Sequence, residues 1–369
     1  MDMRKAALEK LRALGKYVAD KLQRGEEPVL EIPVRSLSNT IWDEKAGILR
    51  LGSQKSRRRL LDRSSVRAYA QTLYLAHIIA KAIEEGDYPT IRDLYYAAKH
   101  TITWRDPVTN RRIAENSFEE QSESDSIIQD IEVMLGILRE QMGIMADAKG
   151  KIVGNMVIES KGHRLNLAEF GVGAYAIPPN ADDINILKVE ADYVLVIEKD
   201  AVFNRLNNEE FWKKHNCIIV TGKGQPDRGT RRMVRRLWEE FGLPVYVLAD
   251  ADPYGFYIYS VYKCGSISLS YESERLAVPE AKFIGVYPSD IYRYKIPKNF
   301  IIKATERDLK RARELLNYPW FANSKLWRRE LELFLKKKEK VEIEAFSGFG
   351  LKFLTEKYIP KKIKMFGSD

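Results

Sequence analysis

The residues best suited to chemistry in this sequence are acids that directly follow apolar runs. Glu198 ends the run YVLVIE, and Asp250 and Asp252 end the run PVYVLAD as an Asp-Ala-Asp pair. Side chains two residues apart on an extended backbone point the same way, so these three carboxylates can converge on one point. Clustered carboxylates repel one another unless a cation neutralises them, and oxygen ligands of this kind suit Mg²⁺. The alternative is that these acids only cap the helices that follow.

A second candidate lies in a helix that the sequence predicts from Thr90 onward. Thr90 is suited to the N-cap, and Asp93 stands three residues later, as in a shortened capping box. Mainly apolar residues recur at helical spacing along one face of this helix, and that face should be buried. It comprises Ile91, Leu94, Tyr95 and Ala98.

Tyr96 points away from that apolar face. Arg92 lies one turn before it and Lys99 three residues after it, so both cations are within reach on the same side of the helix. We therefore expect Tyr95 to pack in the core. Tyr96 would then be available as a nucleophile beside a cation that stabilises developing negative charge. The alternative is an ordinary surface tyrosine.

Basic residues suited to phosphate contacts occur in three places. Lys223 lies in the loop TGKGQPD, whose glycines would let the backbone approach a ligand. Taken alone, this loop is equally a tight turn, and it matches neither a P-loop nor G-x-G-x-x-G. Two clusters also suit a nucleic-acid backbone. They are Lys55, Arg57, Arg58 and Arg59 in one, and Arg228, Arg231, Arg232, Arg235 and Arg236 in the other.

The composition is that of a folded protein with an excess of positive charge. The 369 residues include 61 Lys and Arg against 52 Asp and Glu, a net charge of +9, and 45% are hydrophobic. These values exclude a wholly disordered chain, a collagen-like repeat and a disulfide-stapled mini-protein. Two cysteines, Cys217 and Cys264, are too few for a secreted disulfide framework, so we expect a reducing, cytoplasmic location. The most apolar helical stretch, 73–83, is too short to span a membrane.

The elements that must position Tyr96 are predicted to be mainly helical. An amphipathic helix over 4–24 would pack either on its own domain or on a partner, and short strands follow within 29–53. The order of the next elements is that of a winged helix, in which three helices precede a β-wing. These elements are helices over 64–85, from Thr90, and over 126–141, and a Gly-turned hairpin over 143–158.

The elements that must position the acids are predicted to form an α/β domain. Four apolar, β-branched runs alternate with stretches long enough for helices, which indicates a parallel sheet with right-handed crossovers. The runs are 193–198, 217–222, 244–250 and 282–287. In such a sheet ligands sit outside the carboxyl ends of the strands, where the three acids are placed. The basic helical segment 308–357 should pack back onto the sheet through Leu315, Trp327, Leu331, Phe334, Phe349 and Leu354.

Four motifs in this order strongly resemble those of the A subunit of DNA topoisomerase VI, a type IIB topoisomerase. They are IRDLYY (91–96), VIEK (196–199), TGKG (221–224) followed by PD (226–227), and DADPYG (250–255). The tyrosine motif is also similar to that of the related eukaryotic protein that makes meiotic double-strand breaks. The likeness extends from about Arg57 to Ile363, and the spaced combination is far more specific than any single motif.

The resemblance implies a fold and a role for each site residue. A catabolite-activator-like winged-helix domain at 64–160 would carry the tyrosine, a Toprim domain at 180–369 with a helical C-terminal extension would carry the acids, and 1–63 would make partner or dimer contacts. Tyr96 would attack a DNA phosphodiester to give a 5′-phosphotyrosyl link, with Arg92 stabilising the charge and Asp93 in support. Mg²⁺ would bind Glu198, Asp250 and Asp252. DNA or phosphate contacts are expected from Lys223, Arg57, Arg58 and Arg59.

The resemblance also implies partners. The A subunit is a homodimer that joins two GHKL-type ATPase B subunits in a heterotetramer and cuts both strands of one double-stranded DNA so that another can pass. ATP would act only through the partner, in line with the lack of a nucleotide-binding motif here. Two other classes stay open from the residues alone. A Toprim-type nuclease or primase needs the acids but not Tyr96, and a DNA-binding protein without enzymatic activity needs neither.

Overall fold

The computed structural model describes residues 3–106 and 108–366, which form two compact units. The first lies within residues 1–39 and 51–146, and the second within residues 40–50 and 147–369. The N-terminal segment expected at 1–63 is therefore shared between the two units. Its expected role in partner or dimer contacts stays a prediction.

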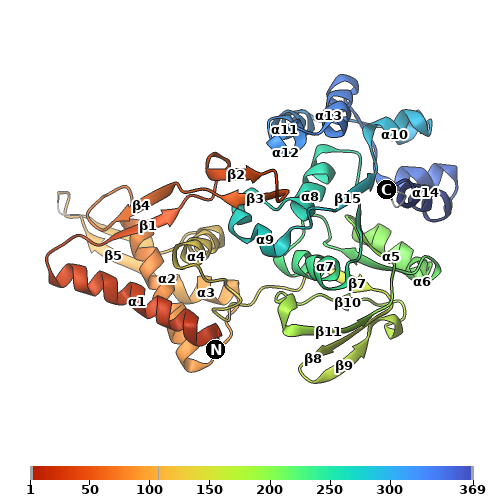
Figure 1. The fold of residues 1–369 in the computed structure, drawn as a ribbon. Helices are drawn as coiled ribbons and strands as arrows, with labels where there is room; N and C mark the ends of the chain where they lie inside the picture. The colour runs from red at the N-terminus through yellow and green to blue at the C-terminus, as the bar shows by residue number, and fades with distance from the viewer. Residues whose placement is uncertain (1–2, 107, 367–369) are drawn as a thin grey trace. The chain divides into compact units, whose positions relative to one another are not determined.

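Helices α1 to α4 of the first unit pack around one core, where β1 contacts α4 and β4 contacts α2 (Figure 1). The core draws on all four helices, through residues such as Leu11, Ile79, Leu94 and Ile131. The elements are α1 (Met3–Gln23), β1 (Val29–Pro33), η1 (Leu37–Asn39), β4 (Lys55–Arg59), α2 (Val66–Glu85), α3 (Ile91–Ala98), β5 (Thr101–Arg105), β6 (Arg112–Asn116) and α4 (Gln121–Leu135).

Helix α1 is the amphipathic helix expected over 4–24. Ala7, Leu11 and Leu14 are buried in the core of the first unit, so this part of the apolar stripe packs on the chain's own body. Val18 is half-buried, and Leu22 at the C-terminal end of the helix is 50% exposed. The choice between packing on its own domain and docking a partner is therefore settled in favour of self-packing for the N-terminal two thirds of α1.

Glycines in the left-handed conformation end two of these helices. Gly86 follows α2 with φ of 82°, and Gly136 follows α4 with φ of 59°. A residue without Cβ adopts this conformation at little cost. Gly136 therefore ends α4 at Leu135, whereas the periodicity predicted a helix over 126–141.

The most apolar helical stretch lies within α2, as expected. No helix in the described part of the chain is long and apolar enough to cross a membrane. Cys217 and Cys264 are both buried and free.

The second unit holds the acids and most of the strands. Its elements up to the central sheet are β2 (Thr40–Asp43), β3 (Ile48–Leu51), β7 (Lys151–Val153), β8 (Met156–Ser160), β9 (His163–Asn166), η2 (Leu167–Glu169), β10 (Tyr175–Ala176), η3 (Ala181–Asp183), β11 (Ile184–Val189) and β12 (Tyr193–Ile197). They continue with α5 (Asp200–Asn208), α6 (Phe211–Lys214), β13 (Cys217–Thr221), α7 (Arg228–Phe241), β14 (Val245–Leu248), α8 (Pro253–Lys263), η4 (Ile267–Glu272), α9 (Ser273–Leu276) and β15 (Lys282–Gly285). The C-terminal part comprises α10 (Pro288–Arg293), η5 (Lys298–Phe300), β16 (Ile302–Lys303), α11 (Glu306–Leu316), α12 (Pro319–Ala322), α13 (Lys325–Lys337), β17 (Glu339–Lys340), η6 (Ile343–Phe349), η7 (Phe353–Tyr358) and α14 (Ile359–Phe366).

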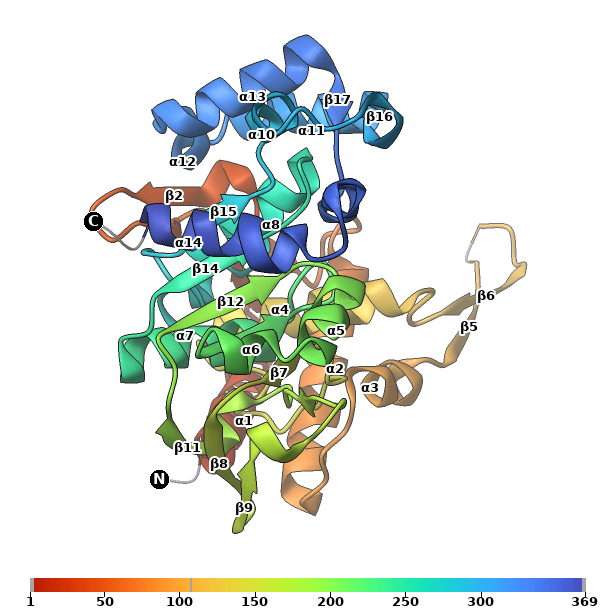
Figure 2. The same cartoon turned by 90° about the vertical axis from the view of Figure 1, so that its right-hand side faces the viewer.

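A six-stranded sheet in the order β10-β7-β13-β12-β14-β15 forms the centre of the second unit (Figure 2). Strands β13, β12, β14 and β15 run parallel, which confirms the four predicted runs, and β7 is antiparallel to β13. Every residue of β12 is buried, and alternate residues face two different cores. Val194 and Val196 join one core, and Leu195 and Ile197 join the other. The apolar runs are therefore continuous because both faces of the sheet are covered.

The predicted hairpin over 143–158 is wrong. Strand β7 pairs with β10 and β13 in the central sheet, whereas β8 pairs with β9 and β11 in a separate three-stranded sheet. The glycine signals in this segment mark the passage between two sheets. Strand β8 forms its hairpin with the next strand, β9, whereas β7 pairs with β13, which lies more than 60 residues later in the sequence and is beyond the reach of local turn signals.

The antiparallel hairpin of the first unit is instead β5–β6, between α3 and α4. Thr101 lies opposite Asn116, and Arg105 lies opposite Arg112. All residues of β5 are exposed. The sequence TITWR of β5 does alternate polar and apolar residues, so a strand signal was present here that the prediction missed.

The arginines of α7 do not form the basic surface that their clustering suggested. Arg231 is 1% exposed, and Arg228 is buried 3.0 Å from a carboxylate oxygen of Glu272. Arg236 pairs with Glu240 at 2.6 Å and also donates to two backbone carbonyls. This cluster therefore ties α7 to its neighbours within the second unit.

The C-terminal helices pack back onto the sheet as expected. Leu315, Trp327, Leu331 and Phe334 join one core of the sheet, and Leu354 joins the other. Phe349 departs from the prediction, because it is 38% exposed. Helix α14 contacts the edge strand β15 (Figure 2).

A buried ion pair fixes α14 on the second unit. The ammonium of Lys362 donates to both carboxylate oxygens of Asp290, at 2.9 and 2.7 Å. The hydroxyl of Tyr358 donates to the same carboxylate at 2.7 Å. Lys362 is 1% exposed and Asp290 is fully buried, so each charge depends on the other.

We predict that Lys362→Ala lowers the free energy of unfolding by about 3–5 kcal/mol, because it removes the buried partner of Asp290 and leaves that carboxylate only the half-exposed Arg293, at 3.7 Å. Lys361→Ala is the matched control, since Lys361 is exposed on the same helix. Its effect should stay within about 0.5 kcal/mol. Denaturant unfolding of both variants checks this, and equal effects would contradict it.

Candidate active site

Helix α3 presents Tyr96 to solvent and Tyr95 to the core. The hydroxyl of Thr90 accepts from the backbone N–H of Asp93 at 3.0 Å, and the backbone N–H of Thr90 donates to Asp93 Oδ2 at 2.8 Å, so the predicted capping box is complete. Tyr95 is 8% exposed, and its hydroxyl donates to the carbonyl oxygen of Glu119 at 2.9 Å. Tyr96 is 60% exposed. The placement of the two tyrosines that the helical spacing predicts is confirmed.

Arg92 and Asp93 take different places around Tyr96. The guanidinium carbon of Arg92 lies 5.8 Å from the ring centroid of Tyr96, within the range of an attractive cation–π contact. Asp93 is engaged by Thr90, and these hydrogen bonds lower the pKa of the Asp93 carboxyl. The supporting role expected for Asp93 therefore has a physical basis, because its carboxylate fixes the start of the helix that carries Tyr96.

Lys99, expected on the same side as Tyr96, turns toward Tyr95 instead. Its ammonium donates to the hydroxyl of Tyr95 at 2.7 Å and to the carbonyl oxygen of Glu119 at 3.3 Å. Lys99 lies four residues after Tyr95 and three after Tyr96, so helical spacing places it near both tyrosines, and it bonds with the first. Arg92 is thus the cation that the structure places against the ring of Tyr96.

Glu198 and Asp250 meet at the carboxyl edge of the adjacent strands β12 and β14. The backbone N–H of Asp250 donates to Glu198 Oε2 at 3.1 Å. Asp252 is the N-cap of α8, and its Oδ1 accepts from the backbone N–H groups of Tyr254 and Gly255 at 2.9 and 2.8 Å. Asp252 therefore caps a helix, as the alternative prediction has it, while it stays two residues from Asp250 at the same strand end.

Burial raises the pKa of all three carboxyl groups. Burial, reinforced by the negative charge of Asp250, raises the pKa of Glu198 to about 7. Burial also raises the pKa of Asp250 to about 6, although nearby Lys199 opposes this effect, and it raises the pKa of Asp252. Perturbed acids gathered at one point mark a candidate functional site.

Lys199 is a site residue that the sequence reasoning missed. Its ammonium lies 3.1 Å from Asp250 Oδ2, 3.1 Å from Glu342 and 2.9 Å from Glu344. The backbone N–H of Ile343 also donates to Asp250 Oδ1 at 2.8 Å. The one available signal is that Lys199 directly follows Glu198. Nothing in the spacing of Glu342 and Glu344 indicates that they reach the same place.

Across residues 3–106 and 108–366, no group of three or more His, Cys, Asp or Glu side chains is arranged to hold a metal ion. The contacts of Asp250 with Lys199 and of Asp252 with α8 account for this arrangement. The donor set nevertheless fits a hard divalent cation, because all three side chains offer only oxygen ligands and their carboxyl groups are buried together, which raises the pKa of each. Mg²⁺ at this edge therefore stays a proposal.

The loop that carries Lys223 is a tight turn beside the acids. The backbone N–H of Gly224 donates to the carbonyl oxygen of Glu198 at 2.8 Å. A Cβ at Gly222 would lie 2.8 Å from the hydroxyl of Tyr262, so only glycine fits there. The side chain of Lys223 is exposed. Its contact with phosphate stays a prediction.

Arg57, Arg58 and Arg59 differ in what they can offer to DNA. Arg58 is largely buried, forms an ion pair with Asp130 and donates to the hydroxyl of Thr72 at 2.6 Å, which favours a structural role. Arg57 and Arg59 are exposed on β4. Each pairs with an acid of the preceding chain, Arg57 with Glu31 at 3.2 Å and Arg59 with Glu27 at 2.5 Å. DNA contacts by all three arginines stay a prediction.

Three family models match successive parts of the chain. Residues 67–144 match "Type IIB DNA topoisomerase", and residues 149–190 match "All-beta domain in DNA topoisomerase VI alpha subunit". Residues 193–363 match the Toprim domain of the topoisomerase 6 A subunit and Spo11. The second match covers the segment of β7 to β11, where the expected hairpin proved wrong. The third covers the central parallel strands and the acids.

Curated relatives match nearly the whole chain. It is 54% identical to the A subunit of type 2 DNA topoisomerase 6 from Hyperthermus butylicus, over 99% of this chain and 96% of the relative. It is 42% identical to the corresponding protein of Pyrococcus abyssi, over 97% and 94%, and 34% identical to the DNA topoisomerase 6 A subunit of Arabidopsis thaliana, over 94% and 78%. The chain therefore belongs to the family of DNA topoisomerase VI A subunits, and it is the DNA-cleaving subunit of a type IIB DNA topoisomerase, an isomerase.

Proposed function

We propose that this chain cuts and rejoins DNA by transesterification at Tyr96. The hydroxyl oxygen of Tyr96 attacks the phosphorus, the new oxygen–phosphorus bond forms, and the bond from phosphorus to the 3′ oxygen breaks. Tyr96 gives up its proton and the departing 3′ oxygen gains one, so the 5′ phosphate stays linked to the protein. Because the link keeps the energy of the phosphodiester, the reverse reaction reseals the strand without a further energy source.

The observation that carries this proposal is the contrast between two adjacent tyrosines. The hydroxyl of Tyr95 is held by Glu119 and Lys99, whereas Tyr96 is exposed. Arg92 lies against the ring of Tyr96, so positive charge is close to where a phenolate or a pentacovalent phosphate would form. A short helix with a complete capping box presents both residues in fixed directions.

We propose that Glu198, Asp250 and Asp252 hold Mg²⁺ at the carboxyl edge of the sheet. When bound, the ion would supply positive charge against the phosphate oxygens. The residues of this chain prepare the edge for it. The N–H of Asp250 fixes the carboxylate of Glu198, and the backbone of α8 fixes that of Asp252. In the structure the ammonium of Lys199 forms an ion pair with the carboxylate of Asp250.

We predict that Tyr96→Phe abolishes cleavage while duplex binding persists, because the hydroxyl is the nucleophile and phosphate contacts come from other residues. Tyr95→Phe is the matched control. It removes hydrogen bonds worth about 1 kcal/mol each in stability but should leave cleavage intact. Trapping covalent protein–DNA adducts under denaturing conditions measures both variants. An adduct formed by the first variant would reject Tyr96 as the nucleophile. Cleavage by the wild-type protein without any covalent adduct would favour a Toprim-type nuclease instead.

Replacing Asp250 and Asp252 together by Asn should abolish cleavage, and added divalent metal should not restore it, because two of the three charged oxygen donors are lost. The control changes Asp147 and Asp192 to Asn, two exposed acids of the same unit. Calorimetric titration with Mn²⁺ should show binding to the wild-type and control proteins only. If the Asp250 and Asp252 variant bound the metal with unchanged affinity, the site would lie elsewhere.

We infer that the working unit contains two copies of this chain. Each chain offers one proposed nucleophile and a double-strand break needs two, which a two-fold homodimer on double-stranded DNA supplies.

The curated relatives carry the name of an A subunit, so we propose that the partner is a GHKL-type ATPase B subunit, in a heterotetramer of two A and two B subunits. ATP would act through that partner. The buried free thiols of Cys217 and Cys264 are consistent with the reducing cytoplasm proposed as its location.

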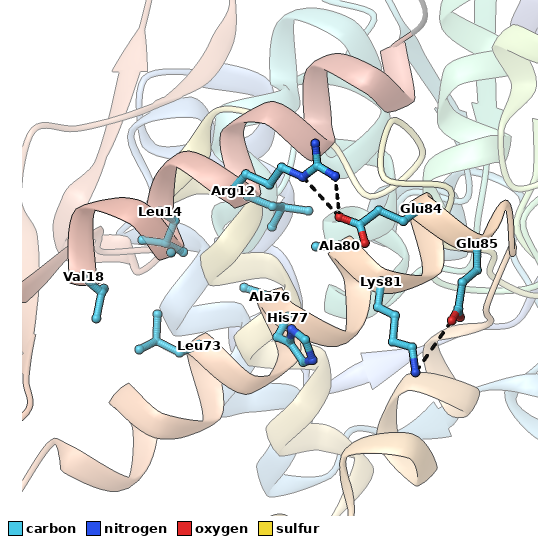
Figure 3. A pocket seen from close by; sticks show the side chains of 12 residues that line it. Arg12, Leu14, Val18, Leu73, Ala76, His77, Ala80, Lys81, Glu84 and Glu85 are labelled. Atoms are coloured by element: carbon cyan, nitrogen blue, oxygen red, sulfur yellow. Dashed lines mark hydrogen bonds and ion pairs between the residues drawn. The ribbon is translucent and has the colours of Figure 1, made fainter. Parts of the chain in front are cut away.

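The groove between α1 and α2 is our candidate docking surface for the ATPase subunit (Figure 3). Its volume is about 650 Å³, and its apolar lining includes Leu14 and Val18 of α1 and Leu73 of α2. Ion pairs stand at its rim, with Arg12 2.8 Å from Glu84. We propose that a segment of the ATPase subunit fills this groove.

Gly15→Arg should abolish co-purification with the ATPase subunit while the chain stays folded. Gly15 lines the groove, and a Cβ at this position meets no atom within 4 Å, so a long side chain would occupy the groove without disturbing α1. Gly15→Ala is the control and should retain the partner, with helix stability raised by up to about 1 kcal/mol. Deleting 1–24 is a poorer test, because Leu11 and Leu14 belong to the core. Relaxation of supercoiled DNA by the purified chain alone would contradict dependence on a partner.

A further inference from the structure

A groove lined by lysines lies in the C-terminal part of the second unit, away from the residues assigned above. Its volume is about 760 Å³, and segments from α10, η5, β16, α13 and β17 line it. Five lysines contribute to the lining, and all five are exposed: Lys295, Lys298, Lys303, Lys337 and Lys338. The floor is apolar, formed by Ile291, Ile296 and Ile301.

The positive charge of this groove is not neutralised from within the described chain. None of the five lysines forms an ion pair with a described residue. Glu339 is the single acid among the described residues of the lining, and its carboxylate accepts from the hydroxyl of Tyr292. Lys337 lies 5.2 Å from the ring centroid of Tyr292. Some basic side chains of this unit are paired, as Arg232 is with Asp182 at 2.7 Å, whereas other exposed lysines, such as Lys214 and Lys310, have no ion pair within the described chain. What distinguishes the groove is that five exposed lysines without a carboxylate partner in the described chain gather in one lining, an arrangement that suits an external polyanion.

Two of the lysines stand where the backbone favours glycine. Lys295 and Lys338 follow α10 and α13 with φ of 53° and 56°. These left-handed positions after a helix are usually taken by glycine, because a side chain there costs free energy. Lysine at both positions adds charge to the groove at the expense of local stability.

One short segment joins the groove to the carboxyl edge of the central sheet, where Glu198, Asp250 and Asp252 lie. We call this edge the acid edge. Lys338 and Glu339 line the groove, and soon after them the chain reaches the acid edge, where the backbone N–H of Ala251 donates to the carbonyl oxygen of Val341 at 2.9 Å. Extended chain from Lys338 to Ile343 spans at most about 17 Å at roughly 3.3 Å per residue. That distance equals about five base pairs of duplex, at about 3.4 Å per pair.

We propose that this lysine groove binds the phosphate backbone of the duplex that flanks the cleavage site. A polyanion whose charges recur along its length matches a row of flexible ammonium groups, which act as point charges and need no fixed geometry. The contact is independent of base sequence. The inference depends on the proposed function only for the identity of the polyanion.

The test measures the binding of a mixed-sequence duplex of about 40 base pairs to the full chain in the presence of EDTA, so that no cleavage step contributes. The groove variant combines Lys298→Gln, Lys303→Gln and Lys337→Gln. The control variant combines Lys45→Gln, Lys214→Gln and Lys310→Gln, three exposed lysines of the same unit outside the groove. Affinity is recorded from about 50 to 200 mM salt.

We expect the slope of log affinity against log salt to become less steep by about 2 to 3 in the groove variant, since each lost phosphate contact removes about 0.9. Affinity at physiological salt should fall at least about tenfold. The control should keep the wild-type slope. Equal changes in both variants, or no change in either, would overturn the proposal. So would unchanged DNA binding with loss of the ATPase subunit, which would make the groove a protein-docking surface.

A second variant covers the case of misfolding, and the covalent adduct separates the groove proposal from the proposed function. If the triple variant does not fold, Lys298→Glu with Lys303→Glu replaces it, because both residues are exposed and have ordinary backbone conformations. If the chain binds duplex through the groove but never forms a covalent adduct, the groove proposal stands and the proposed function fails. If adducts form normally and the groove variant binds like the control, the groove proposal alone fails.

Discussion

The ammonium of Lys199 lies where carboxylates from distant parts of the chain meet, and the acid edge is built around it. Asp250 at the end of β14 and Glu342 and Glu344 of the C-terminal segment all lie within about 3 Å of its nitrogen. Without a cation, so many acids at one edge would repel one another. Lys199 therefore lets the sheet and the C-terminal segment close on each other. Burial raises the pKa values of Glu198 and Asp250 even though the charge of Lys199 acts in the opposite direction.

Segment 341–344 extends this organisation from the sheet to the C-terminal helices. Its backbone bonds with Ala251 and with the carboxylate of Asp250, and Lys340 pairs with Asp308 of α11 at 2.9 Å. The acid edge and the strand β17 that leads into the lysine groove are therefore consecutive parts of one short segment. On the proposed function, a cation that took over Asp250 would compete with Lys199 for the same carboxylate. The geometry of the edge and the position of this segment are thus physically linked.

The tyrosine is positioned by a different and more local mechanism. Tyr95 and Tyr96 are adjacent, so a helix directs them about 100° apart. The hydroxyl of Tyr95 is satisfied by Glu119 and Lys99, which holds one face of α3 in the core and so leaves Tyr96 outside. Such an arrangement needs only a capped helix of eight residues and one buried partner. It tolerates the exposure that a large substrate such as duplex DNA requires.

Features that depend on neighbours in sequence were predictable from the sequence alone. The capping box of Thr90 and Asp93, the burial of Tyr95, the exposure of Tyr96 and the four parallel strands all follow from local periods and from the placement of apolar residues. The approach of Glu198 to Asp250 was also predictable, because parallel strands bring their carboxyl ends to one edge. The resemblance of the motifs led to the correct family for the same reason, since it rests on short runs in a fixed order.

Tertiary structure alone decided the features that depend on distant partners. The strands β7 and β8 join different sheets, and Arg228 and Arg232 of α7 pair with Glu272 and Asp182, which lie outside the helix and which no spacing within α7 reveals. Lys199 meets Glu342 and Glu344 because more than 140 residues of intervening chain fold back. The periodicity of a sequence reports which face of an element is buried. Which charges meet across that face depends on contacts between elements, which the local pattern does not encode.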